Sequence, residues 1–284
     1  MGKAVRHKQD FTIGVVISTY NNPEWLAKTL WGYCFQTHPA DEFIIADDGS
    51  NEETKQLIDS FRDKLSSINH VWHEDAGFRK SMILNKAIVA SKADYLIFTD
   101  QDCIPRNDFV ETHFKNARAG HYLSGGYFKL NMSVSQAITT DDIKTQRVFD
   151  IGWLRKNGQP RSSKDIKLVK NKFIARLLNI LTPTKPTWNG STSSGWRKDI
   201  IYLNGFNEDM GYGGQDVEFG LRMVNYGIKP KQMRYSAVLL HLDHARPYRI
   251  DEVRANNRAI RKHTKENKVI KTPREIDLDK MCSP

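Results

Sequence analysis

The sequence of 284 residues contains few cysteines, no long apolar run and no apolar segment near its start. Only Cys34, Cys103 and Cys282 occur, without the spacing of a zinc site, which argues against a disulfide framework and a cysteine-based zinc site. No apolar run approaches the roughly 20 residues of a membrane-spanning helix, so we predict no transmembrane segment. The first dozen residues are polar, so we expect no secretory signal and a cytoplasmic protein.

Positive charge is present in excess and is unevenly distributed. The 43 Lys and Arg residues exceed the 33 acidic residues and give a net charge of +10. Residues 1–100 carry 11 basic and 14 acidic side chains, whereas residues 101–284 carry 32 and 19. The basic part of the chain indicates an anionic partner, and composition leaves nucleotide phosphates, nucleic acid and an anionic membrane surface all open.

Short β-branched apolar segments alternate with amphipathic ones in the first hundred residues. We predict strands at 11–18, 43–46, 70–72 and 95–98. We predict a first helix capped by Asn21 or Asn22, and two further helices at about 52–65 and 79–91. Further along, we predict a Gly-rich loop that enters a helix at 212–227 and a last strand at 235–241. We expect a basic solvated helix or tail at 246–274. Strands that alternate with helices predict an α/β fold with a mixed, mostly parallel sheet and helices on both faces.

Acidic and polar residues follow three of the predicted strands. They are Tyr20-Asn21, Asp47-Asp48 and Asp100-Gln101-Asp102. Ligands of open α/β sheets bind beyond the carboxyl ends of the strands, so we expect these side chains to share one site. Asp47 and Asp48 are also suited to a turn and helix cap, and this alternative stays open.

Asp100 and Asp102 are separated by one residue directly after an apolar strand. Carboxylate oxygens of this kind bind Mg²⁺ or Mn²⁺, although two acids in a solvated loop have the same pattern. His241 and His244 follow the last predicted strand, and a neutral imidazole is a good Mn²⁺ ligand. Either histidine completes a metal site only if the fold brings it to Asp102.

The segment from Gly211 to Glu218 contains paired glycines just before a predicted helix. Such glycines allow the backbone to approach a ligand closely. Asp216 lies at the start of the helix, where it is suited to act as a general base on an acceptor hydroxyl or to cap the helix. The segment Phe78-Arg79-Lys80 precedes an earlier predicted helix. Its Arg and Lys side chains can bind a phosphate, or they can lie on the solvated face of that helix.

Residues 164–181 alternate basic and apolar side chains with helical spacing. The pattern is typical of an amphipathic helix that rests on an anionic membrane. It also fits a helix that is packed on the core with a solvated basic face, and we slightly favour this second interpretation.

Taken in order, these motifs resemble glycosyltransferase family 2 of the GT-A fold. The resemblance starts at Val15-Val16-Ile17-Ser18-Thr19-Tyr20-Asn21 and continues through Asp47-Asp48-Gly49-Ser50 to Asp100-Gln101-Asp102. The segments Asn189-Gly190-Ser191, Asn204-Gly205-Phe206 and Gly213-Gly214-Gln215-Asp216 are similar to the carboxyl half of β-1,4-galactosyltransferases, polypeptide N-acetylgalactosaminyltransferases and chondroitin-type polymerases. The match spans about residues 11–248.

The resemblance implies a role for each matching residue. Asp216 would be the catalytic base, and Asp102, His244 and His241 would bind Mn²⁺ or Mg²⁺. The implied nucleotide-sugar contacts are Ser18, Thr19, Tyr20, Asn21, Asp47, Asp48, Phe78, Arg79, Asn85, Asp100 and Gln101. The implied acceptor or sugar contacts are Trp188, Gly190, Tyr212, Gly213, Gly214, Gln215 and Glu218. The family has Glu where this chain has Gln215, and typically Trp where it has Tyr212.

The resemblance also implies how the chain is divided and what it does. We expect a donor-binding half at 1–120, an acceptor-binding half at 121–248 and a basic C-terminal helix or tail at 249–284, within one GT-A domain. The expected reaction is inverting, metal-dependent transfer from a UDP-sugar to a glycan or lipid-linked glycan of a surface polysaccharide or lipopolysaccharide, with possible peripheral contact at the inner face of an anionic membrane. A nucleotidyltransferase and a non-catalytic nucleotide-sugar binder are the alternatives. We expect no nucleic-acid partner, because no nucleic-acid-binding module is recognisable.

Overall fold

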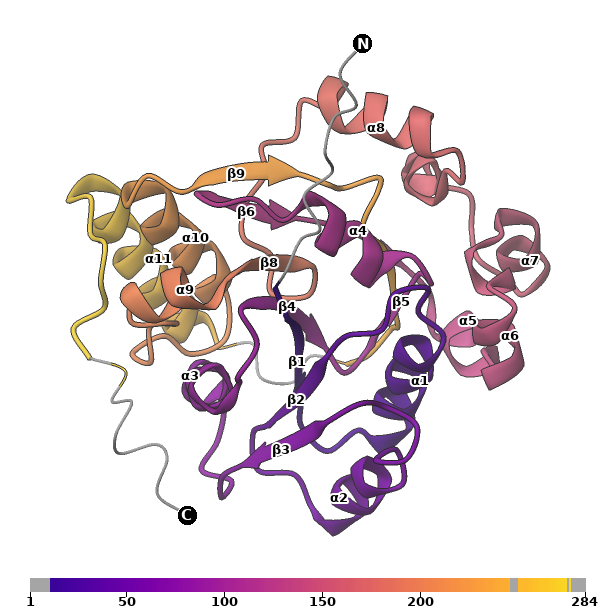
Figure 1. Ribbon diagram of the computed structural model, residues 1–284, viewed down its shortest axis with the longest axis horizontal. Helices are drawn as coiled ribbons and strands as arrows, with labels where there is room; N and C mark the ends of the chain where they lie inside the picture. The colour runs from indigo at the N-terminus through magenta and orange to yellow at the C-terminus, as the bar shows by residue number, and fades with distance from the viewer. Residues whose placement is uncertain (1–10, 246–249, 275, 277–284) are drawn as a thin grey trace.

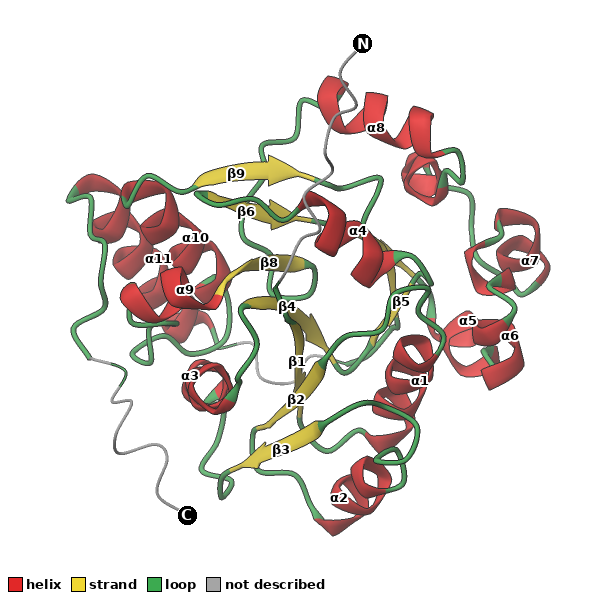
Figure 2. Ribbon diagram, viewed as in Figure 1, coloured by secondary structure: helices red, strands yellow, loops and turns green. Residues whose placement is uncertain are grey.

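A seven-stranded sheet forms the centre of the molecule (Figure 1, Figure 2). The computed structural model describes residues 11–245, 250–274 and 276. The strand order is β3-β2-β1-β4-β8-β6-β9, and β8 alone is antiparallel to its neighbours. This confirms the predicted mixed, mostly parallel α/β fold. The strands are β1 (Ile13–Thr19), β2 (Glu42–Asp47), β3 (Ile68–Trp72), β4 (Tyr95–Asp100), β6 (His121–Ser124), β8 (Ser193–Trp196) and β9 (Lys229–Gln232).

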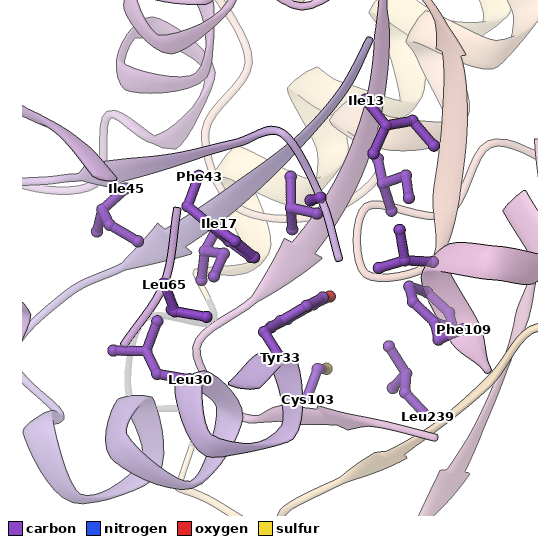
Figure 3. Packing of buried hydrophobic residues seen from close by; sticks show 14 of the residues in the cluster. Ile13, Ile17, Leu30, Tyr33, Phe43, Ile45, Leu65, Cys103, Phe109 and Leu239 are labelled. Atoms are coloured by element: carbon purple, nitrogen blue, oxygen red, sulfur yellow. The ribbon is translucent and has the colours of Figure 1, made fainter. Parts of the chain in front are cut away.

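Helices pack on both faces of this sheet because alternate residues of its strands are apolar. Ile13 and Ile17 of β1 pack with Leu30 and Tyr33 of α1 (Pro23–Cys34) on one face (Figure 3). Val16 packs with residues of α3 (Lys80–Ala90) on the other. Successive residues of a strand point to opposite faces, so β1 is buried on both. The remaining helices are α2 (Glu52–Asp59), α4 (Phe109–Asn116), α5 (Met132–Ala137), α6 (Thr140–Lys144), η1 (Arg147–Phe149), α7 (Ile151–Lys156), η2 (Ser163–Leu168), α8 (Lys172–Leu181), α9 (Arg197–Tyr202), α10 (Gln215–Asn225) and α11 (Asp251–Glu266).

A second, three-stranded sheet joins segments that are far apart in the sequence. Its order is β5-β10-β7, with β5 (Cys103–Pro105), β7 (Gly126–Lys129) and β10 (Val238–His241). β10 pairs antiparallel with β5, so that His241 lies opposite Cys103. The sequence analysis predicted a strand at 235–241 but gave it no partner. This pairing brings the end of β10 to the residues that follow β4.

Several predicted boundaries need correction. Asn22 caps α1 as predicted, by accepting a hydrogen bond from the Trp25 N–H at 3.2 Å. The helix predicted over 52–65 ends at Asp59, and the strand predicted at 70–72 begins at Ile68. The strand predicted over 235–241 begins only at Val238. None of the described helices is long and apolar enough to cross a membrane.

Two segments in the second part of the chain have a different structure from the one that we predicted. The helix predicted over 164–181 is divided into η2 and α8, because Asn171 begins a new helix by accepting hydrogen bonds from the Phe173 and Ile174 N–H groups. Within 246–274, α11 has a polar buried side, formed by Asn257 and Thr264, where we expected no face towards the core. Residues 246–249 and those beyond 276 lie outside the described residues.

Candidate active site

A cleft of about 750 Å³ lies beyond the carboxyl ends of β1 and β4. The chain runs outwards from β1 to β3 and then returns to β4 beside β1, so these strand ends form the switch point at which open α/β sheets bind ligands. Most residues predicted for the site line this cleft: Ser18, Thr19, Tyr20, Asn21, Asp48, Phe78, Asp100, Gln101, Asp102, Tyr212, Gly213, Gly214, Gln215, Asp216, His241 and His244.

Side-chain hydrogen bonds hold the ends of β1 and β4 together. The Ser18 hydroxyl donates to Asp100 Oδ1 at 2.7 Å. The Gln101 amide oxygen accepts hydrogen bonds from the Thr19 hydroxyl at 2.5 Å and from the Tyr20 N–H at 3.0 Å. These bonds fix the floor of the cleft without a ligand. Ser18, Thr19 and Gln101 therefore serve at least to position the wall on which Tyr20 and Asp100 lie.

Asp48 and Tyr20 present different chemistry to the cleft. The two carboxylate oxygens of Asp48 are held by His73 Nε2 at 2.7 Å and by the Arg79 backbone N–H at 2.9 Å. The Tyr20 ring is half exposed, and its hydroxyl donates to Asp75 at 2.8 Å. A fixed carboxylate beside an open aromatic face can accept a hydrogen bond from a base N–H while the base stacks on the ring.

Asp102, His241 and His244 form a compact group of potential metal ligands. One ligand atom from each lies within 4.8 Å of the other two. His244 Nε2 is 3.0 Å and His241 Nε2 is 3.8 Å from Asp102 Oδ2. The Leu242 N–H also donates to the Asp102 carbonyl at 2.8 Å, which secures the approach. The structure thus brings together three residues whose proximity the sequence could not establish.

The hydrogen bonds of both imidazoles favour a cation between them and Asp102. His241 Nδ1 contacts the Leu242 carbonyl and His244 Nδ1 the Ala245 carbonyl, each at 2.8 Å. A carbonyl only accepts, so each Nδ1 carries a hydrogen, and Nε2 is the ring nitrogen that faces the carboxylate. Burial alone would raise the pKa of Asp102, but the hydrogen bond from His244 and the two histidines lower it to about 2. A carboxylate with two imidazoles fits Mn²⁺ and is compatible with Mg²⁺.

Cys103 is adjacent to this group but is not suited to join it as a thiolate. Its sulfur lies 3.3 Å from Asp102 Oδ1. Burial raises the pKa of the Cys103 thiol well above its usual value, and the nearby carboxylates add to the effect. The thiol therefore stays protonated, whereas metal binding requires a thiolate.

Asp216 lies in the same cleft with one carboxylate oxygen unused. Oδ1 is shielded from solvent and has no hydrogen-bond partner within the described part of the chain. Burial raises the pKa of Asp216 to about 6, opposed by the nearby charge of Lys80 and by the Gly190 backbone N–H. A carboxylate that titrates near neutral pH and keeps an oxygen free can accept a proton from a bound hydroxyl.

Lys80 is a cleft residue that the sequence analysis named as a cation but did not assign to the site. Its ammonium group lies 2.5 Å from Asp100 Oδ1. The negative charges of Asp100, Asp216 and Asp102 raise its pKa although burial lowers it, so Lys80 stays charged. Its position next to Arg79 was the available signal. Tyr127, Lys129, Asn189 and Ser191 also line the cleft without having been assigned to it, although Asn189 and Ser191 belong to a segment that carries the resemblance.

The loop before Asp216 depends on its glycines and on two amide side chains. Gly213 and Gly214 have φ angles of +109° and +91°, which L side chains adopt only with strain. The Gln215 amide oxygen accepts a hydrogen bond from the Gly213 N–H at 2.9 Å. Asn257 of α11 donates to the carbonyls of Gly211 at 3.0 Å and Gly213 at 2.9 Å. Gln215 therefore shapes the loop, and α11 supports it from behind.

Three residues predicted for the acceptor or donor pocket are buried away from the cleft lining. Glu218 is 1% exposed and forms an ion pair with Arg222 at 2.9 Å. Trp188 is packed in the core against Phe98. Asn85 donates to the Phe206 carbonyl at 2.9 Å. Glu218 and Asn85 thus bond to other parts of the protein and the Trp188 ring is enclosed, and none of the three lines the cleft; their expected contacts with sugar or nucleotide stay predictions.

Three further predicted residues lie one layer behind the lining. Asp47 accepts a hydrogen bond from the Ser50 N–H and contacts His70 Nε2, each at 2.8 Å, so it holds the turn after β2. The Arg79 guanidinium is directed to the Glu74 carbonyl, and only its backbone N–H meets Asp48. Gly190 lies against Asp216: an added Cβ would be 2.7 Å from the carboxylate.

Comparison with known proteins agrees with this geometry. The family model described as "Glycosyl transferase family 2" matches residues 14–167. A validoxylamine A glucosyltransferase of Streptomyces hygroscopicus subsp. jinggangensis is 26% identical over 235 residues, which cover 76% of this chain and 52% of that protein. A chondroitin synthase of Escherichia coli is 26% identical over 226 residues, which cover 76% and 32%. The chain thus spans about half or less of these relatives' length.

Solved structures share the fold at low sequence identity. Staphylococcus aureus TarS in complex with UDP-GlcNAc aligns with a TM-score of 0.58 and 14% identity over 91% of this chain and 70% of that one. The mannosyltransferase PcManGT from Pyrobaculum calidifontis, in complex with GDP-Man and Mn²⁺, aligns with a TM-score of 0.57 and 17% identity over 88% and 63%. Since the family model covers more than half of the sequence, the chain belongs to glycosyl transferase family 2, and its GT-A fold is that of a glycosyltransferase.

Proposed function

We propose that the protein transfers a hexose or N-acetylhexosamine from a UDP-sugar to a hydroxyl group of a glycan or glycolipid, with inversion at the anomeric carbon. The observation that carries this proposal is that an unpartnered carboxylate oxygen, on Asp216, and the Asp102–His241–His244 group line one cleft. Two substrates can therefore meet with a base on one side and a diphosphate site on the other. Such positioning is a major part of catalysis of bimolecular reactions.

In this mechanism Asp216 accepts the proton of the acceptor hydroxyl as its oxygen attacks the anomeric carbon. The bond from that carbon to the diphosphate oxygen breaks, and UDP leaves. Asp102, His241 and His244 would hold Mn²⁺ or Mg²⁺, which when bound neutralises charge on the diphosphate. Lys80 keeps Asp216 ionised and holds Asp100 in place on the donor side.

The nucleotide and the acceptor are assigned by chemistry and by the relatives. Asp48 and Tyr20 offer a hydrogen-bond acceptor and a stacking face for uracil. A related structure contains UDP-GlcNAc, and the relatives include a chondroitin synthase and a hyaluronan synthase of Pasteurella multocida. The basic part of the chain favours an acceptor that carries phosphate, as a lipid-linked precursor of lipopolysaccharide or another surface polysaccharide does.

A UDP-release assay with a panel of donors tests the proposal. UDP-galactose, UDP-glucose, UDP-GlcNAc and UDP-GalNAc are each incubated with the protein and Mn²⁺, Mg²⁺ or a chelator, and GDP-mannose serves as the contrasting donor. We expect one UDP-sugar to release UDP faster than the others, and chelation to stop the release. Pyrophosphate release from UTP and a sugar 1-phosphate, without UDP release from any donor, would instead identify a nucleotidyltransferase.

The metal site is tested by Asp102→Asn. This variant removes the only carboxylate of the three-residue group, so we expect Mn²⁺ to enhance UDP binding in the wild type and not in the variant. UDP affinity is measured by calorimetry with and without Mn²⁺, and Asp199→Asn on α9 is the control. If Mn²⁺ strengthens UDP binding equally in both proteins, Asp102 is not a ligand.

A further inference from the structure

Helix α8 exposes its apolar side to solvent. Phe173, Ile180 and Leu181 are 76%, 73% and 67% exposed, and Ile174 and Leu177 are 45% exposed each. At 100° per residue these side chains share one side of the helix, opposite the buried Ala175. Five large apolar residues on one exposed side form a patch of the kind that marks an interaction site. The sequence analysis favoured a helix with this side packed on the core, and the structure corrects that interpretation.

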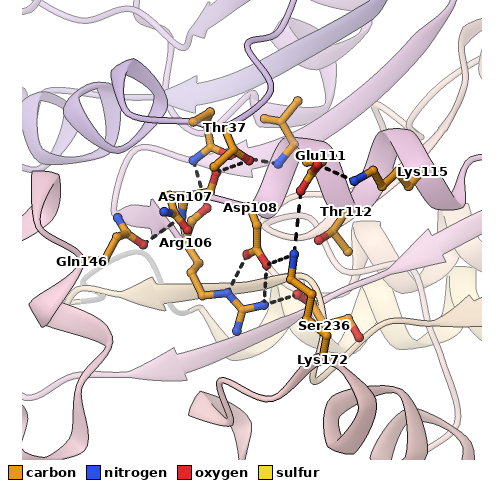
Figure 4. Close-up of polar contacts among 12 residues, drawn as sticks. Thr37, Arg106, Asn107, Asp108, Glu111, Thr112, Lys115, Gln146, Lys172 and Ser236 are labelled. Atoms are coloured by element: carbon orange, nitrogen blue, oxygen red, sulfur yellow. Dashed lines mark hydrogen bonds and ion pairs between the residues drawn. The ribbon is translucent and has the colours of Figure 1, made fainter.

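The opposite side of α8 is firmly attached to the molecule. Asn179 donates to the Ser236 hydroxyl at 2.7 Å and accepts a hydrogen bond from the Tyr235 N–H at 2.9 Å. At the start of the helix, the Lys172 ammonium group lies 3.9 Å from carboxylate oxygens of Asp108 and Glu111 (Figure 4). The helix therefore cannot turn its apolar side inwards without breaking these contacts. Figure 1 shows α8 at the rim of the molecule, beyond the sheet.

The segment that contains α8 is rich in positive charge. Residues 161–185 contain seven Lys and Arg residues and a single acid, Asp165, which is paired with Arg155. Lys164, Arg176 and Lys185 are exposed and form no ion pair with any residue that the structure describes. An exposed apolar row in a segment rich in unpaired basic residues is typical of helices that lie in the interface of anionic membranes.

We propose that α8 docks the protein on an anionic lipid bilayer, with the row from Phe173 to Leu181 inserted at the level of the headgroups. A second copy of the chain is a poorer occupant, because pairing two such helices would bring two basic segments together. Anionic headgroups instead neutralise this charge while the acyl chains cover the apolar row. This surface lies on α8, away from the residues that line the cleft, so membrane binding is independent of whether the proposed sugar transfer is correct.

Sedimentation with vesicles tests the proposal on the full chain. Vesicles of phosphatidylcholine alone are compared with vesicles that contain phosphatidylglycerol and phosphatidylcholine at about 1:3, at low and high salt. The test variant is Phe173→Gln/Ile180→Gln, and the matched control is Ile151→Gln/Val224→Gln, which replaces exposed apolar residues of α7 and α10. Thermal unfolding of each protein checks that it is folded. Because the replaced side chains are exposed, we expect little change in the unfolding temperature.

We expect the wild type and the control to bind the anionic vesicles, and salt to weaken this binding. The partition coefficient of the test variant should fall by at least about tenfold, because two large apolar side chains that would be buried in the bilayer have been replaced by polar ones. Equal binding by the test variant, or no binding of the wild type to anionic vesicles, would overturn the proposal. A wild-type dimer in solution that becomes a monomer in the test variant, with no vesicle binding, would identify a second copy as the occupant instead.

Discussion

At the scale of single residues, the site depends on two aspartates with opposite environments. His244 and His241 hold the pKa of Asp102 at about 2, so it is ionised at every physiological pH and suited to bind a cation. Burial raises the pKa of Asp216 to about 6, so it is ionised at pH 7 yet able to take up a proton. Separate environments of this kind often distinguish the roles of two carboxylates in one active site.

The pH dependence of turnover provides a test of Lys80. With saturating donor and Mn²⁺, we expect turnover to fall as the pH decreases through about 6, because the base becomes protonated. The charge of Lys80 lowers the pKa of Asp216, so Lys80→Met should raise it and shift this acid limb to higher pH. The pH profile of turnover is measured for both proteins and for Lys86→Met on the same helix. An unchanged limb, or a shift to lower pH, would contradict the role given to Lys80.

A motif in the sequence could indicate which residues line the cleft. It could not indicate this where the direction of a side chain determines whether the residue faces the cleft. Asp216, Asp102 and Tyr20 line the cleft, and the roles that the resemblance implies for them stay predictions. Asp47 and Asp48 could not be distinguished, because both end one strand and neighbouring residues point in different directions. In the structure Asp48 lines the cleft, whereas Asp47 is enclosed by the turn and by His70.

At the scale of elements, α10 and α11 support the loop that leads to Asp216. The Glu218–Arg222 pair lies inside α10, and the Arg222 guanidinium also donates to the carbonyls of Leu203 and Gly205. Thr264 of α11 donates to Glu218 at 3.0 Å. Neither helix contact was evident from the sequence, because a buried polar pair and a polar helix face produce no apolar periodicity.

The variant Glu218→Ala tests whether this residue supports the fold or contacts sugar. It would leave the Arg222 charge buried without its partner, which costs about 3 to 5 kcal/mol in the free energy of unfolding. Chemical denaturation measures this loss, and the exposed Glu53→Ala serves as the control. Unchanged stability together with a large rise in the KM for the donor would restore Glu218 to the sugar-binding pocket.

The segment before β8 is tested by Gly190→Ala. The added Cβ would lie 2.7 Å from the Asp216 carboxylate, so the carboxylate must move while the backbone stays in place. We expect turnover to fall by about 10²-fold with little change in UDP affinity, since a displaced base affects the reacting geometry alone. Turnover and UDP titration are measured beside Gly152→Ala on α7. Native turnover in Gly190→Ala would show that the position of Asp216 is not critical.

At the scale of the whole molecule, the site exists because distant segments meet at one sheet edge. The parallel strands β1 to β4 were predictable, since their apolar runs and loop residues alternate regularly. The β5–β10 pairing was not, because strand partners far apart in sequence leave no local signal. The exposed apolar side of α8 was also beyond the sequence pattern, which shows that a helix is amphipathic but not which side faces the core.

The most direct measurement is turnover and UDP binding of Asp216→Asn, made side by side with the donor identified in the release assay. The amide cannot accept the acceptor proton at neutral pH, so we expect turnover to fall by about 10² to 10⁴-fold. Binding of UDP with Mn²⁺ should remain at the wild-type level, because Asp102, His241 and His244 are unchanged. Near-native turnover by Asp216→Asn would show that another group takes the proton, and would contradict the proposed catalytic arrangement.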